Sequence, residues 1–345
     1  MEGLFGYKFE KLTTLTFFMK YEIIILTIFF QLLHNQNVYS QALFKSTTVE
    51  ASIDNDFLNV IGKRTDRYYT NGMNLSVYYF QPENRKFFLD KMLWSFKMDT
   101  SKKYGWGITQ KIFTPDNVFN PIHSTVDFPY SGSLYTIHSL QSVNTLKNAK
   151  FNSEIWIGVL GPLSIAEGTQ WHYHMLIKIR IAKGWESQIQ NTVILNYKLK
   201  YDRKIVSTQY LNIIGDVEGN AGTLLNQLGS GVQMRLGKLT DYFDLKFEGY
   251  SFYFTCSSRL NFVLYNANLQ GSIFNSKTQT LVEFEPLERT LPASEINNFY
   301  TENCLGVHLN NKLFSVSYNQ FFWSQSTKNT ESHSYGSLTI AMKVK

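Results

Sequence analysis

The chain of 345 residues has only two cysteines, Cys256 and Cys304, and only 17% of its residues are charged. Two cysteines cannot build the disulfide framework of a small secreted domain, although they allow either one disulfide or two unpaired buried thiols. Low charge combined with 16% aromatic residues is unusual for a soluble α/β enzyme and favours an all-β protein. No Pro- or Ser-rich linker divides the sequence, so we predict one domain.

The sequence also lacks a long hydrophobic run. No stretch after residue 40 approaches 18 consecutive apolar residues, which excludes a transmembrane helix there. The run at residues 23–33 (IIILTIFFQLL) is too short to span a bilayer, but it matches the apolar region of a signal peptide. We therefore expect residues 1–40 to be a signal peptide, cleaved near Ser40, and residues 41–345 to be the mature domain. An N-terminal membrane anchor is the alternative.

Several common catalytic motifs are absent. The sequence has no G-x-S-x-G, H-E-x-x-H or C-x-x-C motif, which argues against a serine hydrolase, a zincin and a dithiol oxidoreductase. The formal net charge of +6 is a mild excess that suits an anionic partner such as a lipid phosphate surface. We expect no nucleic-acid partner for an exported protein.

Apolar alternation with a period of two recurs along the mature chain. In residues 69–79, Met73, Leu75 and Val77 fall on one face, and residues 107–112, 231–236, 312–319 and 337–344 repeat the pattern. A soluble sandwich would bury this apolar face, whereas a transmembrane barrel would turn it toward lipid. The export signal, the aromatic residues near segment ends and segments of about ten residues favour the barrel. We predict a transmembrane antiparallel β-barrel of about twelve strands.

One segment departs from this alternation. Residues 168–191 (GTQWHYHMLIKIRIAKGWESQIQN) contain a helix-compatible run from about Thr169 to Ala182. Helical spacing of four places Gln170 and His174 on one face. The β-branched residues in the second half of the run are equally compatible with a strand. The pattern predicts a short helix in an extracellular loop between two barrel strands.

Few side chains stand out as candidates for chemistry. His174 is a candidate general base, because imidazole titrates near neutral pH, although a loop histidine is more often a surface residue. Asn55 and Asp56 offer two oxygen ligands for a hard cation such as Ca²⁺. Turn capping is the simpler interpretation of this pair when it is considered alone. Thr70 fits either an ordinary strand position or a site.

Short motifs follow one another along most of residues 50–345. They are NDF (55–57) with TDRYYTNG (65–72), FTPDN (113–117), DFPYSGSLY (127–135), GVLGP (158–162), Gln170 with His174, and GWESQIQN (184–191). In this order they resemble the signature of the outer-membrane lipid A 3′-O-deacylases. An ordered series of motifs is far more specific than any one of them.

This resemblance implies a twelve-stranded barrel in the bacterial outer membrane, with its active site toward the outer leaflet, between the wall and a loop helix. It implies a Ca²⁺-dependent ester hydrolase that removes the 3′-linked acyl or acyloxyacyl chain of lipid A, the lipid part of lipopolysaccharide. By motif, His174 would activate water, Asn55 and Asp56 would place Ca²⁺ and the oxyanion, and Thr70 would line the site. Gln170 would contact substrate.

The sequence departs from the family pattern at Arg180, where the family has a carboxylate six residues after the catalytic histidine. We consider Arg180 a candidate ligand for a lipid A phosphate. Two other functions remain open at this point. One is an outer-membrane phospholipase that acts on glycerophospholipids, and the other is a non-catalytic pore or structural barrel.

Overall fold

The computed structural model describes most of the mature domain. The described residues are 47–62, 66–80, 87–97, 100–120, 127–246, 249–274 and 289–344. The expected signal peptide, residues 1–40, lies outside them.

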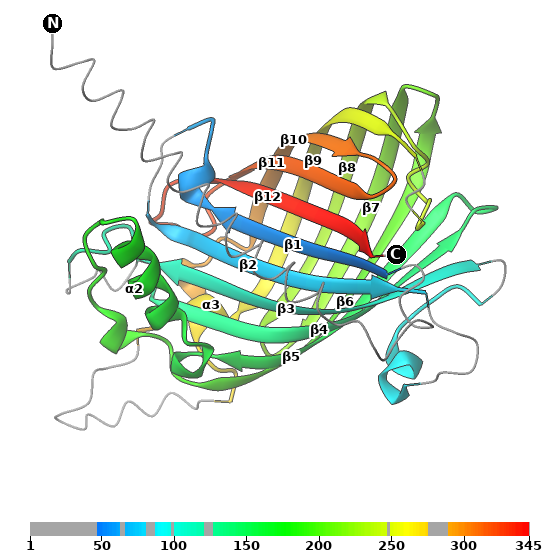
Figure 1. The fold of residues 1–345 in the computed structure, drawn as a ribbon. Helices are drawn as coiled ribbons and strands as arrows, with labels where there is room; N and C mark the ends of the chain where they lie inside the picture. The colour runs from blue at the N-terminus through cyan, green and yellow to red at the C-terminus, as the bar shows by residue number, and fades with distance from the viewer. Residues whose placement is uncertain are drawn as a thin grey trace, which may run out of the picture.

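Twelve antiparallel strands of the described residues close into a barrel, in which each strand pairs with its neighbours in sequence and β1 pairs with β12 (Figure 1). This confirms the predicted fold and strand number. The strands are β1 (Thr47–Asn55), β2 (Tyr68–Tyr79), β3 (Thr100–Thr114), β4 (Ser131–Asn144), β5 (Ala149–Leu160), β6 (Thr192–Ser207), β7 (Leu211–Gly222), β8 (Leu225–Lys238), β9 (Ser251–Asn266), β10 (Phe299–Asn310), β11 (Phe314–Trp323) and β12 (His333–Val344).

Alternation along β9 shows which face of the wall is apolar. Phe252, Phe254 and Leu260 are exposed on the outside, while Thr255 and Asn261 are buried toward the lumen. An apolar face that is exposed rather than buried is typical of a membrane barrel and not of a soluble sandwich. Of the two interpretations of the alternation, the structure therefore favours the one in which the apolar face of the strands turns toward lipid.

The two cysteines follow the same alternation. Cys304 on β10 is opposite Ser257 on β9, so Cys256 belongs to the other face of the sheet. Cys256 is exposed, Cys304 is buried, and both are free. Of the two alternatives, the unpaired one is correct, but only Cys304 is a buried thiol.

Two α-helices of the described residues lie in connections at one end of the barrel. Helix α2 (Ala166–Leu176) lies between β5 and β6, and α3 (Ala267–Gln270) follows β9 (Figure 1). Short 3₁₀ helices are η1 (Asp56–Leu58), η2 (Phe88–Met92), η3 (Pro162–Ser164), η4 (Trp185–Ser187) and η5 (Ala293–Glu295). No helix of the described residues is long and apolar enough to cross a membrane.

Helix α2 begins and ends earlier than the sequence predicted. It starts at Ala166 rather than Thr169 and ends at Leu176 rather than Ala182. Lys178 has a φ of 57°, in the left-handed region, which stops the helix. The β-branched residues at 177, 179 and 181 do not favour its continuation. The predicted helix in a loop is present, and its last turns were the wrong part of the prediction.

Candidate active site

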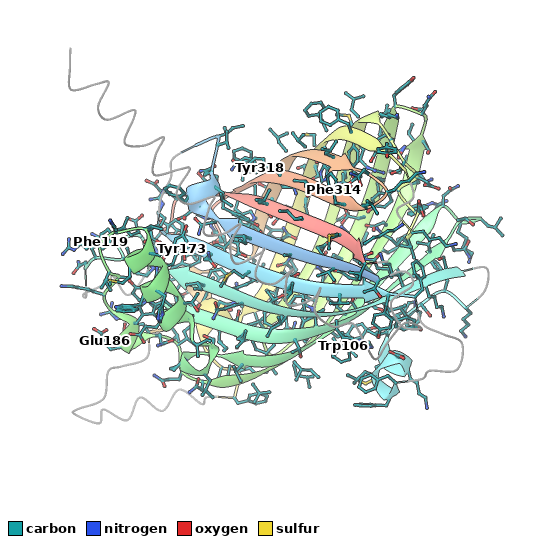
Figure 2. The ribbon with its side chains drawn as sticks, in the orientation of Figure 1. Trp106, Phe119, Tyr173, Glu186, Phe314 and Tyr318 are labelled. Carbon is teal, nitrogen blue, oxygen red and sulfur yellow. The ribbon has the colours of Figure 1, made fainter. Side chains whose placement is uncertain are left out.

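A cavity of about 320 Å³ lies between helix α2 and the wall at β2 and β3. It is on the outside of the barrel, because its wall residues Met73 and Ile112 belong to the outward-facing rows of their strands. Figure 2 shows Tyr173 of α2 beside this part of the wall. The cavity is lined by Asn55, Asp56, Phe57, Asp66, Thr70, Asn71, Met73, Ile112, Thr169, Gln170, Tyr173, His174, Ile177 and Ile179.

All but one of the predicted site residues line this single cavity. The structure brings together Asn55, Asp56 and Thr70 from one region of the sequence with Gln170 and His174 from another. Arg180 is not among the lining residues. Its guanidinium lies over the ring of Phe119, 5.3 Å from the ring centroid, so its predicted contact with a phosphate stays a prediction.

A β-bulge turns Thr70 toward the cavity. The register between β2 and β3 shifts after Tyr69, which is opposite Phe113, so that Asn71 is opposite Ile112 and Thr70 is the extra residue. Bulges of this kind re-aim side chains and are common beside active sites. Consecutive residues Thr70 and Asn71 therefore both line the cavity, and the Thr70 hydroxyl donates to the Ile112 carbonyl at 3.4 Å.

Asn55 and Asp56 stand where β1 passes into η1. Asn55 caps this helix, because its Oδ1 accepts from the Phe57 amide at 2.7 Å. The capping interpretation is thus confirmed for Asn55, and it coexists with a place in the cavity lining. Asp56 is buried and its Oδ2 accepts from the Arg67 amide at 3.3 Å. Burial, followed by the charge of nearby Asp66, raises the pKa of Asp56 well above its usual value.

Gln170 and His174 lie on adjacent turns of α2, and their exposed fractions are only 5% and 2%. Trp185 holds Gln170 in place, since the indole Nε1 donates to Gln170 Oε1 at 2.7 Å. The amide Nε2 of Gln170 is buried and has no hydrogen-bond acceptor within the described part of the chain. It remains available as a donor to a bound molecule.

The two ring nitrogens of His174 have different partners. Nδ1 donates to the Arg180 carbonyl at 2.8 Å, and Nε2 lies 3.2 Å from Asp66 Oδ2. A carbonyl oxygen only accepts hydrogen bonds, so Nδ1 carries a proton and Nε2 is the basic nitrogen of the neutral ring. Burial lowers the pKa of His174, but Asp66 and the Arg180 carbonyl outweigh it, and the net pKa is raised.

Asp66 is the site residue that the sequence analysis missed. It comes from the loop between β1 and β2 and lies within the TDRYYTNG motif, which was the available signal. The family pattern led us to expect a carboxylate six residues after His174, where the sequence has Arg180 instead. The carboxylate that faces His174 is Asp66, and Arg180 contributes its backbone carbonyl.

The Arg67 side chain turns away from the cavity and joins three loops. Its Nη1 lies 2.6 Å from Asp116 and its Nη2 lies 2.7 Å from Glu331, while its amide donates to Asp56. Arg67 follows Asp66 directly in sequence, so its amide contact links this part of the loop to Asp56. Because its charge is matched by Asp116 and Glu331, Arg67 does not neutralise Asp56 and Asp66.

The oxygen atoms of the cavity are the features relevant to a metal. Among the described residues, no three His, Cys, Asp or Glu side chains are grouped as metal ligands. Two carboxylates, Asp56 and Asp66, and the amide of Asn55 nevertheless line the same cavity. Asp66 Oδ2 is buried and has no well-formed hydrogen bond within the residues described.

Comparison of the sequence with models of known protein families identifies the family of this chain. The family model described as "Outer membrane protein LpxR" matches residues 24–344. The chain belongs to this family. The match confirms the family expected from the ordered motifs, and it agrees with the outer-membrane barrel fold.

A solved structure shares the fold of this LpxR family member. The structure of LpxR from Salmonella typhimurium is 19% identical, with a TM-score of 0.66, and the match covers 86% of this chain and 100% of that one. The β domain of the Bordetella autotransporter BrkA matches with a TM-score of 0.41 at 5% identity, over 87% of this chain and 99% of that one. No curated protein sequence matches the chain.

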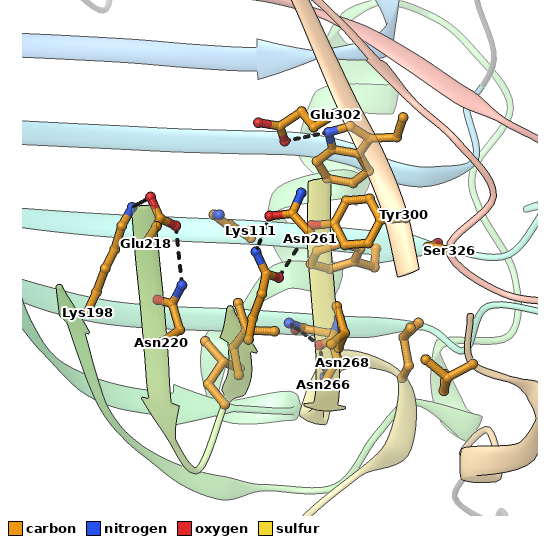
Figure 3. Close-up of a pocket in the computed structure, with 18 of the residues that line it drawn as sticks. Lys111, Lys198, Glu218, Asn220, Asn261, Asn266, Asn268, Tyr300, Glu302 and Ser326 are labelled. Atoms are coloured by element: carbon orange, nitrogen blue, oxygen red, sulfur yellow. Dashed lines mark hydrogen bonds and ion pairs between the residues drawn. The ribbon is translucent and has the colours of Figure 1, made fainter. Parts of the chain in front are cut away.

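A second cavity of this family member, about 370 Å³, lies in the lumen (Figure 3). Figure 3 shows Lys198 beside Glu218, and their charged atoms are 3.4 Å apart. Asn261 Oδ1 accepts from the side-chain amide of Gln227 at 2.8 Å. A polar interior is usual for outer-membrane barrels. No histidine is among the described residues that line this cavity, whereas His174 lines the outer-wall cavity.

Proposed function

We propose that this protein is an outer-membrane lipid A deacylase that hydrolyses the ester of the 3′-linked acyl or acyloxyacyl chain. The observation that carries the proposal is the single outer-wall cavity, which collects Asn55, Asp56, Thr70, Gln170 and His174 beside a lipid-facing surface. Membership of the LpxR family supports it. A cavity on the lipid side of the wall suits a substrate whose acyl chains remain in the membrane.

The cavity faces the outer leaflet in this proposal. The two longest connections are at its end, at residues 161–191 between β5 and β6 and 267–298 between β9 and β10, although residues 223–224 between β7 and β8 form a tight turn there. At the other end, residues 145–148, 208–210 and 311–313 form tight turns, and the longer connections are residues 80–99 and 239–250. Outer-membrane barrels have short periplasmic turns and longer extracellular loops.

His174 is the general base of the proposed hydrolysis. Nε2 takes a proton from a water molecule while the water oxygen attacks the ester carbonyl carbon, and the proton then passes to the departing alcohol oxygen. The bond from Nδ1 to the Arg180 carbonyl holds the tautomer and the ring orientation that this step requires. Asp66, 3.2 Å from Nε2, stabilises the imidazolium that forms.

The oxygen donors of the cavity fit Ca²⁺. The carboxylates of Asp56 and Asp66 repel each other, because their charges have the same sign. The buried Oδ2 of Asp66 lacks a well-formed hydrogen bond in the described structure. Together with the Asn55 amide oxygen, the two carboxylates would hold a hard cation, which prefers oxygen ligands. When bound, Ca²⁺ would supply positive charge to the ester carbonyl oxygen and its developing oxyanion. The free Nε2 of Gln170 is a further donor for substrate.

Mass spectrometry of lipid A tests this function with His174→Ala. We expect deacylation to fall by about 10²- to 10⁴-fold, the usual contribution of a general base. His172→Ala is the matched control, because His172 is on the same helix, is exposed, and does not line the cavity. Both variants must show the heat-modifiable migration of a folded barrel.

One result would overturn the proposed mechanism, and a second would overturn the proposed function. One is undiminished deacylation by a folded His174→Ala variant, which would remove the histidine mechanism. The other is unchanged lipid A together with new lysophospholipids in cells that express the gene, which would show an outer-membrane phospholipase instead.

A further inference from the structure

Residues 87–96 form a small apolar element at the end of the barrel opposite α2, which we call the foot. It contains η2 and lies outside the barrel (Figure 1). Its inner side packs on the wall, where Leu89 and Leu93 form a buried cluster with Leu140 and Ile155. Ile155 is opposite His138, which is opposite the partly exposed, outward-facing Trp106, so the foot covers the lipid-facing side of β4 and β5.

Polar contacts fix the foot to this wall. His138 Nε2 lies 2.7 Å from Asp90 Oδ1, and His138 Nδ1 lies 3.2 Å from the Gly105 carbonyl. The Ser153 hydroxyl donates to the Trp94 carbonyl at 2.9 Å. His138 is buried, and its ring stacks on that of Trp106, with centroids 4.3 Å apart. The foot is therefore an ordered element and not a loose loop.

The outer side of the foot is also apolar. Phe88, Met92 and Trp94 are 67%, 59% and 60% exposed. A short element that is apolar on both sides is stable only if neither side faces water. The surrounding wall faces lipid in an outer-membrane barrel, and the foot continues that surface outward.

Charge and height indicate the depth of the foot in the bilayer. Lys91 and Lys97 are exposed, and neither has an ion-pair partner among the described residues. Along β3, Trp106 beneath the foot and Ile112 beneath the active-site cavity are about 20 Å apart at the usual strand rise. Because barrel strands tilt by about 40°, this distance corresponds to about 15 Å along the membrane normal, and the apolar band of such barrels is about 25 Å tall. The foot thus lies toward the other leaflet from the cavity.

We propose that the foot is a membrane anchor that inserts Phe88, Met92 and Trp94 into the phospholipid leaflet on the side opposite the active-site cavity. Lys91 and Lys97 meet the phosphates of the headgroups there, and Trp94 sits at the boundary that tryptophan prefers. The anchor holds the barrel at a fixed height. It rests on the barrel fold and does not depend on the deacylase activity.

Spin labels measure this depth directly. Single cysteines at Phe88→Cys or Met92→Cys are made in the full chain, with Cys256 and Cys304 both changed to Ser. Leu146→Cys, in the exposed turn between β4 and β5 at the same end, is the reference in water, and Leu195→Cys on β6 is the reference in lipid. The protein is placed in vesicles of phosphatidylethanolamine and phosphatidylglycerol.

We expect the ratio of collisions with oxygen to collisions with a nickel chelate to be several-fold higher at 88 and 92 than at 146, and close to that at 195. A ratio equal to that at 146 would overturn the proposal. Trp94 gives a second measurement without labels. The fluorescence of Trp94 is the difference between the emission of the unchanged protein and that of Trp94→Phe. We expect phospholipids with brominated chains to quench this difference. Quenching by aqueous iodide instead would also overturn the proposal.

Discussion

The cavity on the outer wall and the cavity in the lumen have similar volumes, about 320 and 370 Å³, but their charges are arranged differently. In the lumen, Glu218 lies between two cations, 3.4 Å from Lys198 and 3.3 Å from Arg259. On the outer wall, Asp56 and Asp66 are two like charges near one histidine. The luminal charges are compensated within the protein, whereas uncompensated charges in a cavity indicate a site where a ligand could balance them.

The largest effect should come from removing divalent cations. If the carboxylates of the outer-wall cavity are completed by Ca²⁺, chelation with EDTA should abolish deacylation, and added Ca²⁺ should restore it. The lumen has matched charges, so the heat-modifiable migration of the barrel should not change. Lipid A mass spectrometry measures the first result and gel migration the second, with Mg²⁺ as the comparison ion. Full activity in EDTA would contradict the Ca²⁺ site.

The sequence predicts most of this architecture because the relevant patterns are local. A strand turns alternate side chains to opposite faces, so the period of two indicates both the strands and their apolar face. Helical spacing likewise places Gln170 and His174 together. Asp66 could not be assigned to His174 in this way, because their contact joins two distant loops. No local pattern shows that Arg180 acts through its carbonyl while its side chain lies over Phe119.

Replacing Asp66 tests the least predictable contact of the outer-wall cavity. Asp66→Asn keeps the shape of the side chain but removes the charge beside His174 Nε2 and a proposed Ca²⁺ ligand. We expect deacylation to fall by about 10²-fold or more. Glu167→Gln, an exposed change in the first turn of α2, is the control for charge and should keep full activity. If Asp66→Asn and Glu167→Gln were equally active, Asp66 would not belong to the site.

The same kind of change in the lumen should affect stability and leave the chemistry intact. Glu218→Gln leaves Lys198 and Arg259 facing each other without their common carboxylate. These side chains are partly exposed and Arg259 keeps its contact with Asp216, so the loss should be below the roughly 3 kcal/mol that breaking a fully buried pair costs. We expect the urea midpoint of the folded barrel to fall in lipid vesicles, with deacylation per folded protein unchanged. Loss of activity in the folded fraction would show that the two cavities are coupled.

The smallest effect should come from Arg67, which touches neither cavity with its side chain but joins the loops around the site. A lysine cannot reproduce the fork by which Arg67 contacts Asp116 and Glu331 together. Arg67→Lys should therefore weaken the attachment of the loop that carries Asp66 and raise the Ca²⁺ concentration for half-maximal activity by about tenfold. At saturating Ca²⁺ kcat should change little, because His174 and its contact with the Arg180 carbonyl remain. Arg67→Ala should shift the Ca²⁺ requirement further than Arg67→Lys. If both variants instead lowered kcat at saturating Ca²⁺ and left the requirement unchanged, Arg67 would position the base or the substrate and not the metal ligands.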